Sequence, residues 1–161
     1  MGCESHVSAT AEHEKWMQIA LQEAEKAHRK QEVPVGAVVV YEGKIIGRGH
    51  NLVESLQDPT AHAEVIAITA AANSLASWRL EDTTLYVTLE PCPMCAGAVA
   101  LARVPRVVYG ASDPRWGACG SVWDVFSERK LDTHPKVVSG VLAAQGVGLL
   151  KEFFESLRSR E

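Results

Sequence analysis

Two short motifs, far apart in the chain, restrict the folds open to this sequence more than any other feature. His62 and Glu64 stand one residue apart, and Cys92 and Cys95 follow a proline with two residues between them. Neutral imidazole and thiolate are zinc ligands, and a zinc ion held by three protein ligands keeps a fourth position for water. The fold must therefore bring the two motifs together around one metal ion.

The residue types also indicate what such a metal ion would do. Thiolates from Cys92 and Cys95 would neutralise much of the zinc charge, so activation of water at neutral pH calls for a base. Glu64 is not required as a ligand and is placed to take and return that proton. A His-x-Glu motif followed by Pro-Cys-x-x-Cys is typical of zinc enzymes that deaminate nucleosides and nucleobases.

Three other interpretations of the motifs stay open. Cys92 and Cys95 could form a redox pair, although redox motifs of this spacing need no upstream histidine and glutamate. A structural zinc site would need a fourth ligand. A non-catalytic zinc-binding module would likewise close the metal with a protein ligand. The catalytic interpretation is favoured because the first two leave Glu64 without a role. The residues available as a fourth ligand are Cys119, His50 and His134.

Hydrophobic periodicity predicts an alternation of helices and strands. A turn over 58–60 is expected to end in Thr60 as the N-cap of the helix that carries His62. This order predicts a mixed sheet between layers of helices. The expected helices span residues 13–30, 61–76, 93–103, 122–126 and 142–158, and the expected strands span 35–41, 44–49, 84–89, 106–109 and 136–139.

Length and charge limit the class of protein further. The chain has 161 residues and a net charge of −4, which corresponds to one domain without an overall basic field. No apolar stretch approaches the length of a membrane span, so no membrane partner is expected. Residues 1–12 are expected to form a flexible tail and residues 13–161 a single domain. The cysteines suggest a reducing compartment, and a cytoplasmic location is expected.

Several segments closely resemble the bacterial tRNA-specific adenosine deaminases, which belong to the cytidine deaminase superfamily. The resemblance implies a cytidine deaminase-like, three-layer α/β/α sandwich with a central mixed five-stranded sheet. It covers nearly the whole chain from about residue 16 to residue 154. The segments that carry it are 32–38, 58–64, 85–92 and 110–113 continuing into 117–121.

The resemblance also implies an activity, a cofactor and partners. It implies hydrolysis of adenosine to inosine at the wobble position of a tRNA anticodon, with zinc-bound hydroxide attacking C6 and Glu64 shuttling protons. His62, Cys92 and Cys95 would hold one Zn²⁺ per subunit, with no organic cofactor. The anticodon stem-loop is the expected partner, and the chain is expected to form a homodimer.

Five residues are expected, by this resemblance, to contact the substrate. One would hydrogen-bond the target nucleoside, two would line the apolar pocket around the base, one would contact a neighbouring nucleotide, and one aromatic ring would face a splayed base. Each also has an ordinary structural explanation, such as ending a strand, filling a core or forming a turn. In that order they are Asn51, Val35 with Leu89, Asp113, and Phe154 or its neighbour Phe153.

Deamination of a free nucleobase is the main alternative function. Guanine deaminases also carry the Pro-Cys-Pro-Met-Cys sequence of residues 91–95, and the acidic net charge suits a small substrate. The loop from Asp113 to Ser121 fits the tRNA enzymes better and decides in their favour. Within that loop, Trp116 could stack on a base, although a buried tryptophan is the more ordinary expectation.

Overall fold

The computed structural model describes the backbone of residues 2–161 and the side chains from residue 9 onward. Its elements follow the expected alternation closely. In chain order they are α1 (Gly2–Arg29), β1 (Gly36–Tyr41), β2 (Lys44–His50), α2 (Val53–Leu56), α3 (Ala63–Leu75), β3 (Thr83–Leu89), α4 (Pro93–Leu101), β4 (Arg106–Ala111), the 3₁₀ helix η1 (Val125–Ser127), β5 (Lys136–Val138) and α5 (Ala143–Arg158).

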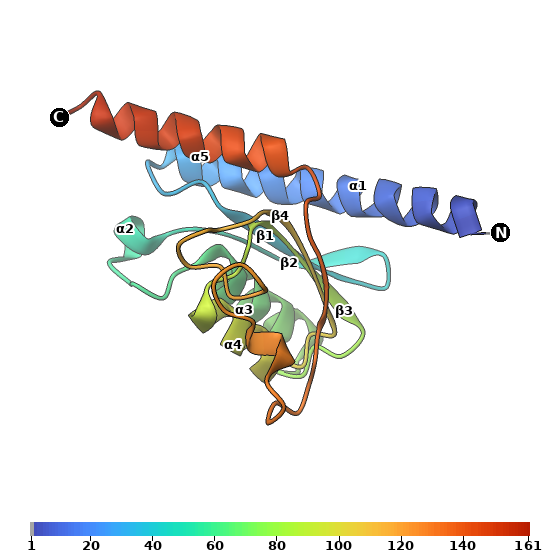
Figure 1. Ribbon diagram of the computed structural model, residues 1–161. Coiled ribbons are helices and arrows are strands. Elements are labelled where there is room, and N and C mark those ends of the chain that lie inside the picture. Colours follow the sequence, from blue (N-terminus) through green and yellow to red (C-terminus); the bar gives the residue numbers. More distant parts are fainter. Residues whose placement is uncertain (1) are drawn as a thin grey trace.

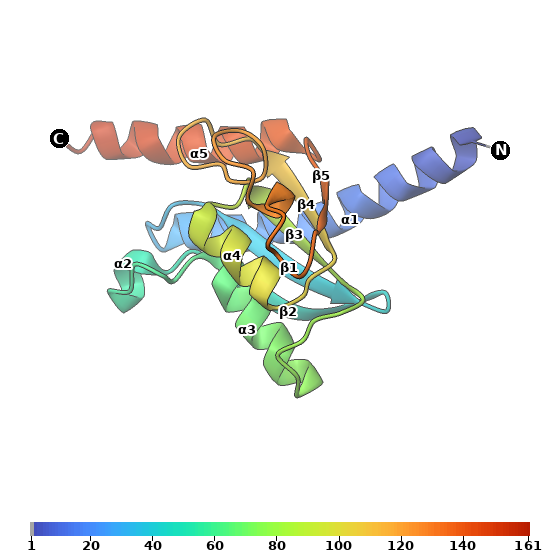
Figure 2. The same ribbon diagram turned by 60° about the horizontal axis from the view of Figure 1, so that its bottom comes forward.

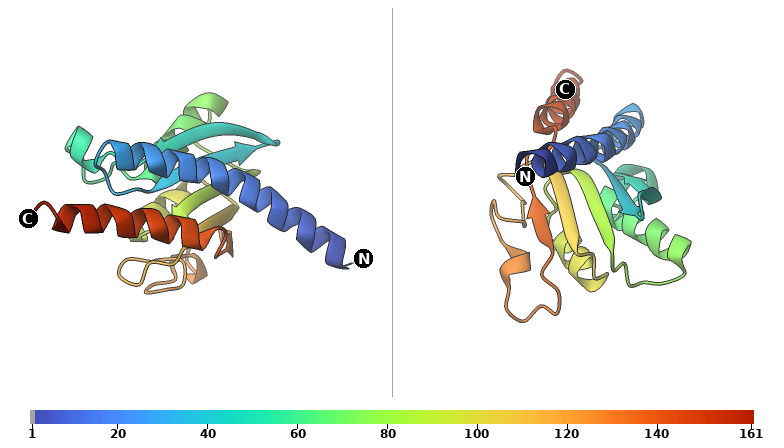
Figure 3. Two further views of the ribbon diagram at one scale, coloured as in Figure 1. Left: turned by 90° about the horizontal axis from the view of Figure 1, so that it is seen from above. Right: turned by 90° about the vertical axis from the view of Figure 1, so that its right-hand side faces the viewer.

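The strands form one mixed five-stranded sheet in the order β2-β1-β3-β4-β5. β1 runs antiparallel to β2 and β3, whereas β4 runs parallel to β3 and β5. Helices α1 and α5 cover one face and α3 and α4 cover the other (Figure 1). Figure 2 shows α3 and α4 beside each other, and Figure 3 shows α1 and α5 crossing the opposite face. The predicted three-layer α/β/α sandwich is confirmed.

The inner strand β1 is buried on both faces, which explains its run of small and β-branched residues from Gly36 to Val40. Successive side chains of a strand point to opposite faces. Val39 accordingly lies in the core shared with α3 and α4. Val38 and Val40 lie in the core shared with α1. The sheet therefore has two separate hydrophobic cores, one on each face.

Helix α3 lies unusually close to β2 because glycine and alanine face each other there. A Cβ atom added to Gly49 would lie 2.3 Å from the carbonyl oxygen of Ala63, and one added to Gly47 would lie 2.3 Å from that of Ala67. Normal carbon contacts need about 3.5–4.0 Å. The missing side chains thus allow the start of α3, and the motif residues at that start, to lie directly on the sheet.

The N-terminal helix is longer than expected. α1 begins at Gly2 and continues through the residues expected to form a flexible tail. Ala9, Ala11 and Glu12 favour helix and allow α1 to propagate in this direction, and residues 9–12 are exposed. The division of the chain into a tail over 1–12 and a domain over 13–161 stays a prediction.

Two local expectations were wrong, and one short helix was missed. Thr60 does not cap α3, because its amide and hydroxyl bind Asp58 and His62 occupies the N-cap position instead. The expected helix over 122–126 is a single 3₁₀ turn, η1, that starts three residues later. The four-residue helix α2 was not foreseen, since it is too short to produce a periodic pattern.

Among residues 2–161, no helix combines the length and apolarity needed to cross a membrane.

Candidate active site and metal centre

The structure brings the three predicted zinc ligands together. The Nδ1 atom of His62 lies 3.6 Å from the Sγ atom of Cys92 and 3.5 Å from that of Cys95. All three atoms lie within 4.8 Å of one another. Zinc bonds of about 2.0–2.1 Å to nitrogen and about 2.3 Å to sulfur at a tetrahedral angle require a separation of about 3.6 Å. The donor set and its spacing therefore fit zinc.

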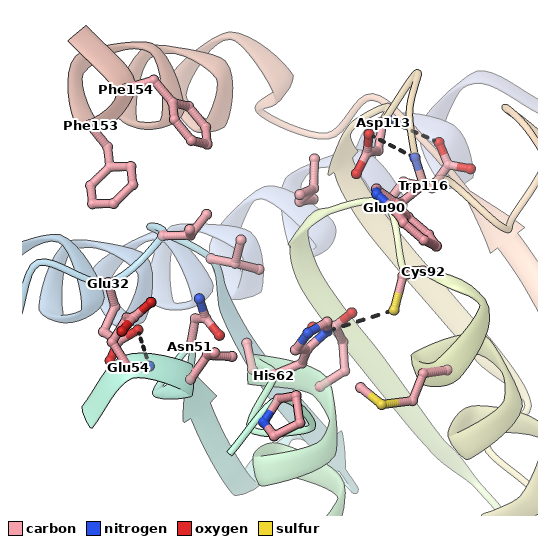
Figure 4. Close-up of a pocket in the computed structure, with 18 of the residues that line it drawn as sticks. Glu32, Asn51, Glu54, His62, Glu90, Cys92, Asp113, Trp116, Phe153 and Phe154 are labelled. Carbon is pink, nitrogen blue, oxygen red and sulfur yellow. Dashed lines mark hydrogen bonds between the residues drawn. The ribbon is translucent and has the colours of Figure 1, made fainter. Parts of the chain in front are cut away.

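Two helix starts position these side chains. His62 is the N-cap of α3, and its extended backbone turns the imidazole towards the cysteines. Cys92 is the N-cap of α4, Pro93 occupies the first helical position, and Cys95 lies buried in the first turn. The amide groups and dipole of a helix N-terminus favour negative charge, so α4 stabilises thiolates at this point. Figure 4 shows His62 and Cys92 meeting at the floor of a pocket.

No fourth protein ligand joins the group among the residues that the structure describes. The side chain of His50 binds Glu23 instead, at 2.9 Å. His134 binds the carbonyl oxygen of Phe126 through Nδ1. Cys119 is buried outside the group. The three candidates for closing a structural site are thus not placed to do so, and a zinc ion held by this group would keep one coordination position for water.

Protons are shared between the three donor groups. The hydrogen bonds from Cys95 and, to a smaller extent, from His62 lower the pKa of Cys92 to about 4, against the opposing effect of burial. The same contact with Cys92 raises the pKa of His62. The hydrogen bond to Cys92, together with burial, raises the pKa of Cys95. Cys95 and His62 therefore donate hydrogen bonds to one thiolate, and a metal ion would displace these protons on binding.

Glu64 lies in the first turn of α3, two residues after His62, and its side chain is buried at 4% exposure. Burial raises the pKa of its carboxyl group, although contacts with its own backbone and with Cys95 act in the opposite direction. The residue lines the same pocket as His62 but does not join the group of metal donors. Its position suits a group that exchanges protons with a bound molecule.

The metal donors lie at the base of a cavity of about 810 Å³. Pockets for small ligands span about 300–1,000 Å³, so this cavity is large for a single nucleobase. It is formed by the starts of α3 and α4, the loop after β4, helix α5 and the segment around α2 (Figure 4). All five expected substrate contacts line it, namely Val35, Asn51, Leu89, Asp113 and Phe154.

Asn51 provides the clearest sign of a missing ligand. Its side chain is only 8% exposed, and its Oδ1 atom has no hydrogen-bond partner among the described residues. Its backbone amide donates to the carbonyl oxygen of Val35 at 3.1 Å, which fixes the residue at the end of β2. A buried polar atom without a partner is costly, so this oxygen is placed to accept a hydrogen bond from a molecule in the pocket.

The other expected contacts have mixed environments. Val35 is 9% exposed and belongs to the core on the α3 side, and Leu89 packs partly against that core. Asp113 is half-buried, and its Oδ1 atom accepts hydrogen bonds from the amides of Arg115 and Trp116 at 2.9 and 3.2 Å. The turn expected at Asp113 is therefore present, and the same side chain also reaches the pocket.

The two phenylalanines of α5 differ in their exposure. Phe153 is 6% exposed and packs edge-on against His28 of α1. Phe154 is 46% exposed and contacts the ring of Phe153 at 5.2 Å between centroids. As expected, one ring anchors the helix, and the structure identifies Phe154 as the ring that is free to meet a ligand.

Glu32 was missed as a part of the site. It is 1% exposed and lines the pocket. Its carboxylate accepts hydrogen bonds from the amides of Glu54 and Ser55 and from the hydroxyl of Ser55, at 3.2, 2.6 and 2.7 Å. Burial alone would raise the pKa of Glu32, but these bonds hold it below its ordinary value. Glu32 thus fastens α2 to the rim of the cavity.

Glu90 was also missed, and it holds the opposite wall of the cavity. It is 2% exposed, and its carboxylate accepts bonds from the amides of Asp113, Cys119 and Ser121 at 3.0–3.1 Å, and from the Ser121 hydroxyl. Burial alone would raise the pKa of Glu90, but these bonds hold it below its ordinary value.

Comparison with known proteins agrees with this geometry. Residues 10–111 match the family model described as the cytidine and deoxycytidylate deaminase zinc-binding region. The chain is also 51% identical over 148 residues, 92% of each protein, to the tRNA-specific adenosine deaminase of Bacillus subtilis (strain 168).

The chain belongs to the tRNA-specific adenosine deaminase family.

Two solved structures extend the comparison. One comes from biochemical and structural studies of A-to-I editing by tRNA:A34 deaminases at the wobble position of transfer RNA. It is 43% identical, covers 84% of this chain and 99% of its own, and superposes with a TM-score of 0.82. The guanine deaminase of Bacillus subtilis is 40% identical, covers 71% of this chain and 73% of its own, and gives a TM-score of 0.61.

Membership of this family establishes the chain as an enzyme of the zinc-dependent deaminases. The matched region includes His62, Cys92 and Cys95, the three donors that the structure places at zinc spacing. The expected cytidine deaminase-like fold is likewise confirmed, since the tRNA:A34 deaminase structure covers most of the chain.

Proposed function

We propose that this chain converts adenosine to inosine by hydrolysis at the wobble position of a tRNA anticodon. The observation that carries the proposal is one cavity that extends from His62 and Cys92, two of the three metal donors, to the exposed ring of Phe154. Such a cavity places a flipped-out base at the metal while its RNA strand remains outside. The likeness to relatives named as tRNA adenosine deaminases supports the same substrate.

We assign one zinc ion per subunit to His62, Cys92 and Cys95. Zinc bound there would activate water for hydrolysis as a Lewis acid with an open coordination position. The two helix starts favour the thiolates in this task, and Nδ1 of His62 supplies the neutral donor. The stoichiometry and the role of each donor are part of this proposal.

Glu64 would carry the proton through the reaction. Its carboxylate takes a proton from the attacking water and delivers it to N1 of adenine as the C6–O bond forms. It then assists the loss of the 6-amino group as ammonia, which leaves the C6 carbonyl of inosine. The location of Glu64 supports this role, since it lines the pocket beside His62 without joining the metal donors.

The remaining contacts would hold the nucleoside. The unpartnered Oδ1 atom of Asn51 would accept a hydrogen bond from it. Val35 and Leu89 would contact the faces of the base, and Phe154 would offer its exposed ring to a neighbouring base. Asp113 would use its carboxylate for an adjacent nucleotide.

Free guanine is the competing substrate, because a guanine deaminase that is 40% identical to this chain shares the fold. A free base needs a closed pocket with little accessible aromatic surface. Here Phe154 and Trp116 line the cavity and are 46% and 57% exposed. These open aromatic walls favour a longer single-stranded substrate. Homodimer formation and a cytoplasmic location remain predictions that accompany this function.

The proposal is tested by the product formed on RNA. Purified zinc-loaded protein is incubated with an anticodon stem-loop that contains adenosine at position 34, and inosine is measured by mass spectrometry. Glu64→Gln is the control, since it removes the proton carrier and preserves the metal donors. Inosine formation by the native chain, and its loss in a Glu64→Gln variant that still binds zinc, supports the proposal. A zinc-loaded native chain that leaves the RNA unchanged contradicts it.

A further inference from the structure

Two tryptophans project from the loop between β4 and η1, at the edge of the catalytic cavity. Trp116 is 57% exposed and Trp123 is 45% exposed. Their rings lie 5.9 Å apart between centroids and are tilted by 43°. Trp116 also lines the cavity, where it shares one wall with Asp113 and lies across from Asn51 (Figure 4). The expectation that Trp116 would be buried is therefore wrong.

The loop that carries these rings is firmly held. The amide of Trp116 donates to Asp113 at 3.2 Å, and the amide of Trp123 donates to the carbonyl oxygen of Gly117 at 3.0 Å. Beneath them, the buried carboxylate of Glu90 accepts hydrogen bonds from three residues of the loop. The backbone thus fixes both tryptophans in place, and their exposure is not explained by a loosely packed loop.

The chemistry of this patch suits an unpaired nucleobase. Large apolar side chains that gather on a surface mark sites of interaction. Indole rings stack well on the flat faces of bases, and proteins that bind single-stranded nucleic acid use aromatic rings in this way. Arg115, exposed beside Trp116, adds a positive charge for the phosphate of the same nucleotide.

We propose that Trp116, supported by Trp123, forms a stacking subsite for an unpaired base next to the base that reacts. The inference rests on the proposed function and deepens it, because it assigns a further aromatic contact, made by Trp116, to a nucleotide beside the one that reacts. A strand whose reactive base enters the cavity must continue over its rim, where Trp116 lies. Continuity with the cavity favours RNA over a protein partner as the occupant of this patch.

The subsite is tested by RNA binding with a matched pair of variants. Trp116→Ala removes the stacking ring, Trp116→Phe keeps a smaller aromatic face, and Trp78→Ala removes an equally exposed tryptophan, 59% exposed, beyond the C-terminal end of α3. Each variant is first checked for zinc content and thermal stability. Affinity is then measured for an anticodon stem-loop, and for versions in which either nucleotide flanking the target adenosine is abasic.

A lost stacking contact weakens binding by about 5- to 150-fold. We expect this loss for Trp116→Ala, a smaller loss for Trp116→Phe and no loss for Trp78→Ala. Of the two RNAs with an abasic flanking nucleotide, one should bind the native chain as weakly as the intact RNA binds Trp116→Ala. Binding of that abasic RNA to Trp116→Ala should show no further loss of affinity.

Two results would overturn the subsite. In the first, Trp116→Ala binds and deaminates the stem-loop as the native chain does. In the second, Trp116→Ala changes the oligomeric state in analytical ultracentrifugation and leaves RNA affinity unchanged, which would assign the patch to a protein interface. Failure of the proposed function is separate and is visible in the native chain, which would then form no inosine.

Discussion

Because β2 and α3 lie in close contact, we expect the substitution Gly49→Ala to disturb the metal site. In Gly49→Ala, the new Cβ atom would lie 2.3 Å from the carbonyl oxygen of Ala63 and 2.7 Å from the amide nitrogen of Ala67. Because both partners are backbone atoms of α3, no side chain can rotate away. Restoring contacts of about 3.5 Å requires the helix to retreat from the sheet by about 1 Å.

That retreat would act directly on the metal site, because His62 immediately precedes Ala63. Zinc–ligand distances tolerate deviations of only about 0.2 Å. We therefore expect Gly49→Ala to lower zinc affinity by about 10- to 100-fold. Overpacking should also cost about 1–3 kcal/mol in the free energy of unfolding. Misplacement of Glu64 by about 1 Å would lower turnover of the zinc-saturated enzyme by about 100-fold.

Competition with a chelating dye measures the zinc affinity, and urea denaturation measures the free energy of unfolding. Gly148→Ala is the matched control, since a Cβ atom at this position in α5 would meet nothing within 4 Å. It should be neutral or stabilising by up to about 1 kcal/mol, because alanine favours helix over glycine. If Gly49→Ala binds zinc as tightly as the native chain does, the proposal that a displacement of α3 from β2 moves His62 is refuted.

Three further predictions concern Glu32, Glu90 and the metal. Glu32→Gln should lower the free energy of unfolding above pH 4.5, the ordinary pKa of this group. The difference in the free energy of unfolding between the variant and the native chain should shrink as the pH falls below 4.5 towards the lower pKa of Glu32 in the folded chain. Urea titrations from pH 7 to pH 4 measure this difference. A difference that does not change with pH would contradict the role given to the Glu32 carboxylate. Glu90→Gln should lower the free energy of unfolding by about 1–3 kcal/mol, because backbone amides of the loop that now donate to the Glu90 carboxylate lose an acceptor. It should also speed hydrogen exchange of the Cys119 and Ser121 amides, and unchanged exchange would count against Glu90 as the anchor. Zinc removal by a chelator should allow iodoacetamide to modify Cys92 first, because its pKa is about 4. Cys119, whose pKa burial raises to about 12, should stay unmodified in both forms; equal labelling of Cys92 with and without zinc would argue against its role as a ligand.

The sequence predicted the metal cluster because each half of it depends on local structure. His62 and Cys92 stand at helix starts that short-range patterns indicate, and only one contact between the helices was needed to unite them. The order of strands followed from the hairpin and the later alternation of helices and strands. Even the error at Thr60 was small, since the cap moved by two residues and Glu64 stayed in the first turn.

The walls of the cavity were less predictable because they depend on contacts between distant segments. Glu90 binds residues 23 to 31 positions away, and Glu32 binds α2 more than 20 positions away. Neither carboxylate has a local pattern that distinguishes it from a surface residue. Burial was the more ordinary expectation for Trp116 beside a possible stacking role, whereas the hydrogen bonds of its loop hold the ring at the surface.

The most direct measurement places both substrates in one reaction. Zinc-loaded protein receives an adenosine-34 anticodon stem-loop and free guanine together, and inosine in the RNA and xanthine in solution are quantified over the same time course. We predict that inosine accumulates in the RNA while guanine remains unchanged. Xanthine formation with intact RNA would contradict this prediction and would place the chain among the free-base deaminases.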